Sequence, residues 1–353
     1  MIGKMLSGLG VGACTIGACA VGFMLGVGTP SSARADDAAS FFKGRTINLA
    51  IGYAVGGGYD MNARLLSRYM GKHIPGNPYV TPQNMPGAGS LKAYKWLYEI
   101  APKDGTAIAT FGRTIPVDPL LGVSPEIDSR KLTWLGSISS DVSVCITWHT
   151  SKIKTVGDLL TKPAKLAGQG AGSDPDVFTS VLKNIFNPKL TLVTGYPGSN
   201  EAGLAMERGE VDGECGVSWS TINVTHPDWV KDHKVNILMQ MALEKQADLP
   251  NVPMMIDLAK DDKTRKMLEF IVTSQTWARP FAAPPGLSDQ MKAVLRKAFD
   301  DTMKDPDFIA EAHKLQLDVR PVSWQKIDQL MAKLYATPPA LIAKAKAAAG
   351  GQM

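Results

Sequence analysis

The stretch INLAIGYAVGGGYDMNARLLSRYM, residues 47–70, joins an apolar run to three consecutive glycines and then to a helix. The apolar run over 47–53 is typical of a buried strand, and the glycines at 56–58 permit backbone conformations and close approaches that other residues resist. Asp60 is placed to cap the helix that follows, whose apolar residues recur at helical spacing. A strand, a glycine turn and a helix N-terminus together favour an anion. The stretch therefore predicts either an anion site or a turn that only redirects the chain.

The sequence lacks the motifs of several common site types. No Gly-Lys-Ser/Thr follows the glycine run, which excludes a phosphate loop, and the spacing differs from the GxGxxG of dinucleotide folds. The five histidines have neither HxH nor HxxxH spacing, and no GxSxG elbow is present. We therefore expect no cofactor, no metal site and no enzymatic activity.

The N-terminus has the pattern of an exported precursor. An apolar, Gly/Ala-rich stretch over 6–27 is followed by Ala-Arg-Ala at 33–35, the small-x-small pattern of a cleavage site. We predict a Sec-type signal peptide over residues 1–35, cleaved after Ala35, and a mature chain in the periplasm. An uncleaved membrane anchor and a lipoprotein acylated at Cys19 are the alternatives.

The net charge of the mature chain limits its possible partners, and its cysteines limit its possible disulfides. Cleavage removes Lys4 and Arg34 and no acidic residue, so the formal net charge falls from +5 to +3. This weakly basic chain carries no nucleic-acid-binding pattern, and we expect a monomer without a nucleic-acid partner. Cys145 and Cys215 remain, and in an oxidising periplasm they either pair or stay as buried free thiols.

Strands and helices alternate along the mature chain, as in βαβ units with a mainly parallel sheet. Apolar runs predict strands over 47–53, 106–111, 142–146, 166–169, 190–195, 215–219, 235–241 and 271–278. Helical spacing predicts helices over 61–70, 91–100, 155–160, 177–185, 202–206 and 291–299, and a last helix that Pro338-Pro339 interrupts. Thr155, Ser288 and Ser323 are placed as caps. The fold class is therefore α/β, and the length fits one large or two medium domains.

The order of strand, glycine-containing turn and helix seen in residues 47–70 occurs twice more. Segments 170–174 and 196–200 each follow a predicted strand and lead into a predicted helix. Three helix N-termini are thus available to an anion.

Two further positions lie at the ends of predicted strands, where α/β folds place ligand groups. Arg113 and Thr114 follow the strand over 106–111. Arg113 pairs with a ligand carboxylate, or is a solvated surface arginine, or pairs with an acid such as Asp118. Trp219 either lines a ligand site or belongs to the core.

Six short motifs occur in order along the mature chain. They are GYAVGGGYD at 52–60, NMPGAGS at 84–90, KDGTAI at 103–108, YPG at 196–198 followed by GEVD at 209–212, LPNVPM at 249–254, and Trp277 before APPGL at 283–287. In this order they resemble the motifs of the substrate-binding proteins of tripartite tricarboxylate transporters, also called the Bug receptors. The resemblance covers essentially the whole mature chain.

This resemblance implies a type II periplasmic binding protein fold with two α/β lobes and a hinge between them. One lobe would hold residues 36–144 and 273–353 and the other residues 145–272, with crossings near Val144 and Thr276. The implied function is capture of a small organic carboxylate and its delivery to integral-membrane transporter subunits. A ligand-loaded sensory receptor for a membrane sensor kinase and an exported α/β enzyme are the alternatives.

The resemblance also implies where the ligand binds. Members of the family hold carboxylates with backbone N–H groups, hydroxyls and waters of loops that match 56–60, 170–174 and 196–200. Together with the positions inferred from the residues themselves, the candidate ligand-binding residues are Tyr53, Ala54, Gly57, Gly58, Tyr59, Asp60, Arg113, Thr114, Gly172, Ser173, Asp174, Tyr196, Pro197, Gly198, Ser199 and Trp219.

Three departures from the family pattern leave the ligand's identity open. Ala54-Val55 replaces a proline pair, Phe111 to Thr114 replaces small or hydroxyl residues, and Asp174 stands where many members have Thr or Gly. The guanidinium of Arg113 either competes with water-mediated carboxylate binding or adds to it.

Overall fold

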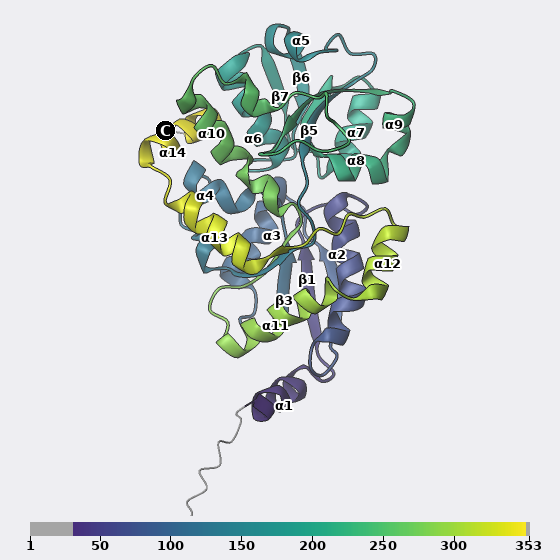
Figure 1. Ribbon diagram of the computed structural model, residues 1–353, viewed down its shortest axis with the longest axis vertical. Helices are drawn as coiled ribbons and strands as arrows, with labels where there is room; N and C mark the ends of the chain where they lie inside the picture. Colours follow the sequence, from purple (N-terminus) through teal and green to yellow (C-terminus); the bar gives the residue numbers. More distant parts are fainter. Residues whose placement is uncertain (1–30, 351–353) are drawn as a thin grey trace, which may run out of the picture.

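The computed structural model describes residues 31–350, with side chains from Asp37 onward. Most of the predicted signal peptide lies outside the described residues, and the backbone of α1 (Ser31–Phe42) spans the predicted cleavage point. Two α/β lobes, each built on its own sheet, stand one above the other (Figure 1). Over the described part of the chain, no helix is long and apolar enough to cross a lipid bilayer.

The first sheet forms the lower lobe in Figure 1 and holds six strands in the order β11-β4-β10-β3-β1-β2. Their bounds are β1 (Thr46–Ile51), β2 (Tyr79–Asn84), β3 (Ala107–Thr110), β4 (Thr133–Ser137), β10 (Pro280–Ala283) and β11 (Val322–Ser323). β1 runs parallel to β2 and β3, whereas β10 runs antiparallel to β3 and β4. β2 contains Pro82, which this strand accommodates because it lies at the sheet edge.

The second sheet forms the upper lobe and holds five strands in the order β7-β6-β8-β5-β9. Their bounds are β5 (Ser143–Trp148), β6 (Ala164–Ala167), β7 (Leu190–Val193), β8 (Gly213–Ser218) and β9 (Val235–Met241). β6 runs parallel to β7 and β8, and β5 runs antiparallel to β8 and β9. The predicted α/β class is confirmed, with mixed rather than mainly parallel sheets.

Helices cover both sheets. The lower lobe carries α2 (Gly58–Tyr69), α3 (Leu91–Lys95), α4 (Asp118–Leu121), α11 (Asp289–Thr302), α12 (Pro306–Lys314) and α13 (Trp324–Tyr335). The upper lobe carries α5 (Val156–Thr161), α6 (Asp174–Val181), α7 (Ser199–Glu207), α8 (Trp219–Thr225), α9 (Pro227–Lys231) and α10 (Asp262–Val272). Single π-helical turns, Trp96–Ile100 and Leu182–Phe186, extend α3 and α6. The 3₁₀ turns are Met70–His73, Ala88–Ser90, Ile115–Val117, Ser129–Lys131, Met255–Leu258 and Thr273–Trp277.

The predicted strand over 271–278 is wrong. This segment is the end of α10 followed by the 3₁₀ turn Thr273–Trp277, and the strand of this region, β10, begins later at Pro280. Ile271, Val272 and Trp277 are almost fully buried. A buried helix end and a buried strand have the same apolar run, and periodicity does not separate them.

Three segments join the lobes. The chain leaves the first sheet after Ser137 and starts the second at Ser143, and it returns between α10 and β10. At the C-terminus, α13 packs on β4 of the lower lobe, and α14 (Pro339–Ala348) then continues to the upper lobe and packs on α10 (Figure 1). The Lys344 ammonium donates to the Thr264 hydroxyl at 2.9 Å across that contact. The C-terminal helices thus tie the two lobes together.

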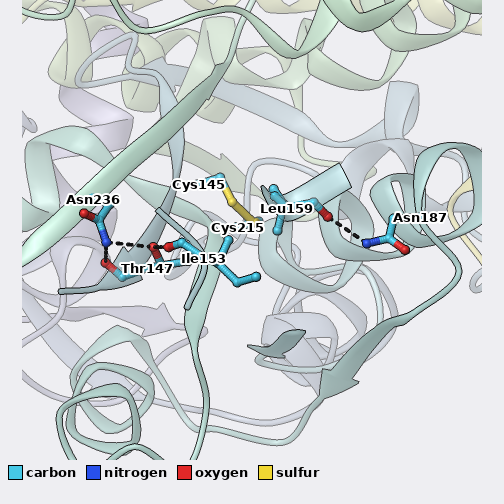
Figure 2. Close-up of a disulfide and its surroundings, with 7 residues drawn as sticks. All are labelled: Cys145, Thr147, Ile153, Leu159, Asn187, Cys215 and Asn236. Atoms are coloured by element: carbon cyan, nitrogen blue, oxygen red, sulfur yellow. Dashed lines mark hydrogen bonds between the residues drawn. A yellow bond between two sulfur atoms is a disulfide. The ribbon is translucent and has the colours of Figure 1, made fainter. Parts of the chain in front are cut away.

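A disulfide joins the two central antiparallel strands of the upper lobe. Cys145 on β5 and Cys215 on β8 are register partners, both are fully buried, and the structure joins their sulfurs (Figure 2). Leu159 of α5 lies beside the bond in the same apolar core (Figure 2). The bond therefore lies inside the upper lobe, on a strand that begins where the chain crosses from the lower lobe.

Candidate functional site

The first predicted loop enters α2 without a side-chain cap. Gly57 is the N-cap residue, and the first intrahelical bond runs from the N–H of Met61 to the carbonyl of Gly57 at 3.0 Å. The N–H groups of Gly57, Gly58 and Tyr59 therefore lie outside the helix's own hydrogen-bond ladder. They carry the partial positive charge of the α2 N-terminus.

Asp60 supports this loop from within and is not the helix cap. Its carboxylate accepts hydrogen bonds from the N–H of Gly56 at 2.9 Å, Nε of Arg64 at 2.9 Å and Nδ2 of Asn84 at 2.8 Å. Burial raises the pKa of the Asp60 carboxyl, but the bonds from Arg64, Gly56 and Asn84 outweigh it and lower the pKa. The predicted cap is wrong because the glycines let α2 begin before Asp60.

The third predicted loop lies against the first across the contact between the lobes. A Cβ added to Gly198 would lie 3.7 Å from the Cβ of Ala54, and one added to Gly56 would lie 3.2 Å from Nδ2 of Asn200. Gly198 is the N-cap of α7, again without a side-chain cap, and its carbonyl accepts from the N–H of Ala202 at 3.2 Å. Two uncapped helix N-termini, one from each lobe, thus meet at this contact.

The second predicted loop is filled by a carboxylate of the chain itself. Asp176 accepts hydrogen bonds from the N–H groups of Gln169 at 2.6 Å and Gly170 at 3.0 Å, from the Ser173 hydroxyl at 2.9 Å and from the Thr194 hydroxyl. Ser173 in turn caps α6 by accepting from the N–H of Asp176. The N–H groups ahead of this helix start therefore already bind an anion of the chain itself.

Arg113 lies between the lobes with 1% of its surface exposed, which excludes the alternative of a solvated surface arginine. Its Nε donates to Asp174 at 2.6 Å, and its Nη2 donates to the hydroxyls of Ser143 at 2.7 Å and Ser218 at 2.8 Å. Thr114 donates to the other oxygen of Asp174 at 2.9 Å. The arginine of the lower lobe therefore pairs with an acid of the upper lobe, which is Asp174 and not Asp118.

A second buried arginine, Arg279, reaches the same region, and sequence reasoning missed it. Arg279 precedes β10, is 1% exposed, and donates to the hydroxyls of Ser218 at 3.1 Å, Ser220 at 3.2 Å and Thr221 at 2.9 Å. Its only sequence signal is its place two residues after Trp277, before the APPGL motif.

Two tyrosines of the first loop complete the lower-lobe side of the contact. The rings of Tyr53 and Tyr59 stack with centroids 4.7 Å apart, and the Tyr59 hydroxyl accepts from the N–H of Arg113 at 3.0 Å. The Arg279 guanidinium lies over the Tyr59 ring, 4.8 Å from its centroid. Burial raises the pKa of both tyrosines, so both stay neutral donors and acceptors.

The structure brings most of the predicted site residues to this interlobe layer, but not all. From the lower lobe come Tyr53, Ala54, Gly58, Tyr59, Arg113 and Thr114, and from the upper lobe Gly172, Ser173, Asp174 and Gly198. A Cβ on Gly57 would meet nothing within 4 Å, Ser199 accepts from Nε2 of Gln169 within the upper lobe at 3.4 Å, and Asp60 bonds within the first loop. Pro197 is exposed, and Tyr196 packs half-buried on the upper-lobe core. Trp219 is 5% exposed and lines a cavity of about 260 Å³ with Asn223 and Gln246.

One buried acid lies at the contact between the lobes. Asp118 of α4 is 1% exposed, neither of its carboxyl oxygens has a hydrogen-bond partner among the described residues, and it abuts Gly172 of the upper lobe. Burial, with a smaller effect of Asp174, raises the pKa of Asp118 well above its usual range. No group of three or more His, Cys, Asp or Glu residues in the described chain could hold a metal ion.

Comparisons with known proteins agree with this architecture. The family model described as "Tripartite tricarboxylate transporter family receptor" matches residues 63–346. The UPF0065 protein in the gbd 5′ region of Cupriavidus necator is 24% identical over 326 residues, covering 89% of this chain and 90% of that protein.

Solved structures share the fold at low identity. The periplasmic binding protein BugD has a TM-score of 0.68 at 19% identity, covering 85% of this chain and 97% of its own. MatC of Rhodopseudomonas palustris with bound malate has a TM-score of 0.64 at 18% identity, with coverage of 84% and 99%. Rpa4515 of R. palustris with adipate has a TM-score of 0.65 at 15% identity, with coverage of 87% and 97%. With the family model matching most of its length, this chain belongs to the receptor family of the tripartite tricarboxylate transporters.

Proposed function

We propose that this protein is a periplasmic receptor that captures a small organic carboxylate between its lobes and delivers it to the membrane subunits of a tripartite tricarboxylate-type transporter. The observation that carries the proposal is the meeting of two uncapped helix N-termini, α2 and α7, from opposite lobes. Each offers backbone N–H donors and partial positive charge to one anion. The relatives solved with malate and with adipate support a carboxylate as that anion.

Capture requires the lobes to separate and close again. In this structure the lobes touch directly, and the N–H of Gly89 donates to the carbonyl of Gln169 at 3.0 Å across them. A ligand that contacts both lobes favours the closed form, because only then does its affinity differ between the two states. A micromolar Kd corresponds to ~8 kcal/mol, and charge-assisted hydrogen bonds contribute about 1.5–3 kcal/mol each. A few such hydrogen bonds, together with burial of the ligand on closure, are sufficient for micromolar affinity.

The finer features of the proposal follow the sequence predictions. The mature protein would begin after Ala35 in the periplasm and act as a monomer with no cofactor and no catalytic step. The lobes would divide into residues 36–144 with 273–353 and residues 145–272. Sheet membership supports this division, since the first sheet holds strands from both outer segments.

A pair of variants at Gly57 tests the site by removing one backbone donor. Gly57 has φ −80°, which suits proline, and a Cβ at this position would meet nothing within 4 Å. Gly57→Pro deletes the N–H group, whereas Gly57→Ala keeps it and is the matched control. We expect the carboxylate affinity of Gly57→Pro to fall about tenfold or more, and that of Gly57→Ala to stay within about threefold.

The ligand for this test comes from thermal-shift screening of organic acids on the purified mature protein, followed by calorimetry. Equal losses in both variants would point to loop distortion and count against a backbone anion site. A protein that no carboxylate stabilises would contradict the receptor proposal itself. Loss of uptake in a deletion strain, restored by the wild-type protein, tests delivery to the transporter and separates it from a sensory role.

A further inference from the structure

We propose that Glu201 is a movable carboxylate that competes with the bound ligand for the start of α7 and thereby limits the affinity of the receptor. This inference rests on the proposed function and adds a residue that regulates the same site. Glu201 lies in the first turn of α7 and is not among the candidate residues predicted from the sequence.

An acidic residue stands at the same position in the three helices that follow the predicted loops. Each acid lies three residues after the N-cap residue of α2, α6 or α7, and the three acids are Asp60, Asp176 and Glu201. A carboxylate at this position is stabilised by the partial positive charge of the helix start and can bind back to N–H groups ahead of the helix. Each helix start therefore has a carboxylate of the chain itself beside it.

Two of these acids are held in place by donors of the chain. Asp60 accepts hydrogen bonds from the N–H of Gly56, from Nε of Arg64 and from Nδ2 of Asn84. Asp176 accepts hydrogen bonds from two backbone N–H groups and from two hydroxyls. A ligand carboxylate cannot displace either acid without breaking these bonds.

Glu201 lacks such an anchor at one of its carboxylate oxygens. Its Oε2 is buried and has no hydrogen-bond partner among the described residues, although the side chain as a whole is only half-buried. A buried carboxylate oxygen without a donor is unfavourable, because it has lost its hydration and gained no bond in return. Rotation of the side chain towards solvent restores that hydration and breaks no bond to Oε2. Of the three acids, Glu201 is therefore the one that can move.

The Glu201 carboxylate also lies where the lobes meet. A Cβ added to Gly198 would lie 3.3 Å from Oε2 of Glu201 and 3.7 Å from the Cβ of Ala54 in the first loop. This point adjoins both the start of α7 and the lower lobe, where the proposed function places the ligand carboxylate. Two carboxylates this close repel each other, so they do not bind the start of α7 together.

Ligand binding therefore includes the displacement of Glu201 from the start of α7. The ligand gains the N–H groups of α7 in competition with an anion of the receptor itself, which lowers its affinity and speeds its dissociation. A receptor that delivers its ligand to a transporter must also release it. When the lobes separate, the returning Glu201 carboxylate takes the place of the ligand at α7.

The test removes the charge of Glu201 and measures affinity and dissociation. Malate, adipate and citrate are each titrated by calorimetry against the mature wild-type protein and against Glu201→Gln, which keeps the shape of the side chain. For each acid that binds, we expect the Kd of Glu201→Gln to be about threefold to tenfold lower, mainly through slower dissociation in stopped-flow displacement. Glu201→Ala should tighten binding in the same direction, because it removes the same charge.

Glu207→Gln is the matched control. Glu207 is the last residue of the same helix, and its Oε1 accepts a hydrogen bond from Nε1 of Trp229 at 2.9 Å, which a glutamine oxygen can also accept. This variant removes one negative charge from α7 but leaves the start of the helix intact, so we expect an unchanged Kd.

Two results would overturn the role of Glu201 and leave the receptor function standing. If Glu201 only stabilises α7, Glu201→Gln would lower the melting temperature and leave the Kd of every acid unchanged. If Glu201 assists binding, Glu201→Gln would raise the Kd. Binding of no carboxylate to the wild-type protein or to any variant would overturn both proposals.

Discussion

Glu214 shows how the surroundings of a single residue set its charge. It lies on β8 with 4% of its surface exposed and accepts a hydrogen bond from Nε2 of Gln169 at 2.8 Å. Burial raises the pKa of Glu214 to about 8, with further repulsion from Asp176 and Asp174, although the bond from Gln169 lowers it. The side chain is therefore neutral in the folded protein at neutral pH.

We predict that the stability contributed by neutral Glu214 is lost as the pH rises. It is fully present below the ordinary pKa of 4.5 and declines up to about pH 8, because the unfolded chain ionises first. Glu214→Gln should remove this pH dependence. At pH 8 it should stabilise the protein by about a few kcal/mol, the order of magnitude that corresponds to the raised pKa of Glu214. Urea unfolding measured across this pH range checks it. The exposed Glu244→Gln is the control, and parallel pH profiles for Glu214→Gln and the wild-type protein would contradict the prediction.

Arg113 and Arg279 show which features of a single residue can be predicted from the sequence and which cannot. Arg113 follows a recognisable strand, so its place at the end of that strand could be inferred, but its burial against Asp174 could not. Arg279 follows a 3₁₀ turn that the sequence presents as a strand. Its neighbours Ser218 and Thr221 lie about 60 residues away along the chain, with separations of 61 and 58. Only the folded arrangement of both lobes brings these groups together.

At the level of elements, the sequence predicted helix starts correctly where a side chain caps its own helix. Thr155, Ser288 and Ser323 each accept a hydrogen bond from the N–H three residues ahead and cap α5, α11 and α13 as predicted. Asp60 failed as a cap because its carboxylate binds back to Gly56 instead. The neighbouring glycines permit several backbone conformations, so residue types alone do not predict at which residue α2 begins.

The disulfide between β5 and β8 gives an element-level prediction. We expect neither Cys145 nor Cys215 to react with an alkylating reagent in denaturant until a reductant is added, as mass spectrometry would record. Removing the bond in a Cys145→Ala/Cys215→Ala variant should lower the free energy of unfolding by about 2–4 kcal/mol, since the bond closes a long loop. Alkylation of both thiols without reductant would show that the protein keeps them free and would contradict the prediction.

At the scale of the whole molecule, the lobes are linked by the two crossings and by the C-terminal helices, and they meet through buried polar groups. Among the described residues, Asp118 in this contact finds no hydrogen-bond donor to stabilise its charge. It lies near Asp174 of α6 and Tyr94 of α3, and it lines one cavity with Asp176. Separation of the lobes would rehydrate Asp118.

Closure should therefore take up a proton at Asp118. Because burial raises the pKa of Asp118 in the closed form, low pH favours closure. This preference for the closed form declines as the pH rises above about 4, the ordinary pKa of an exposed aspartate. It is lost once the pH passes the higher pKa of Asp118 in the closed form. Carboxylate affinity should fall by up to about tenfold per pH unit in this window. Calorimetry in buffers of different ionisation enthalpy measures the proton uptake, and Asp118→Asn should abolish it. An unchanged pH profile in that variant would exclude this coupling.

The architecture of two lobes could be predicted from the order of motifs, whereas the interlobe contacts could not. Motif order reports the family and its fold, but the pairing of Arg113 with Asp174 and of α2 with α7 depends on how the lobes close. The filled loop at Asp176 is a further example, because the residue that occupies the predicted anion position comes from within the same helix start.

A crystal structure of the mature protein with its tightest-binding carboxylate tests the central claim most directly. We predict density for the ligand between the lobes, with carboxylate oxygens within hydrogen-bond distance of the N–H groups at the starts of α2 and α7. Density for that ligand elsewhere, with these N–H groups bound only to water, would contradict the account.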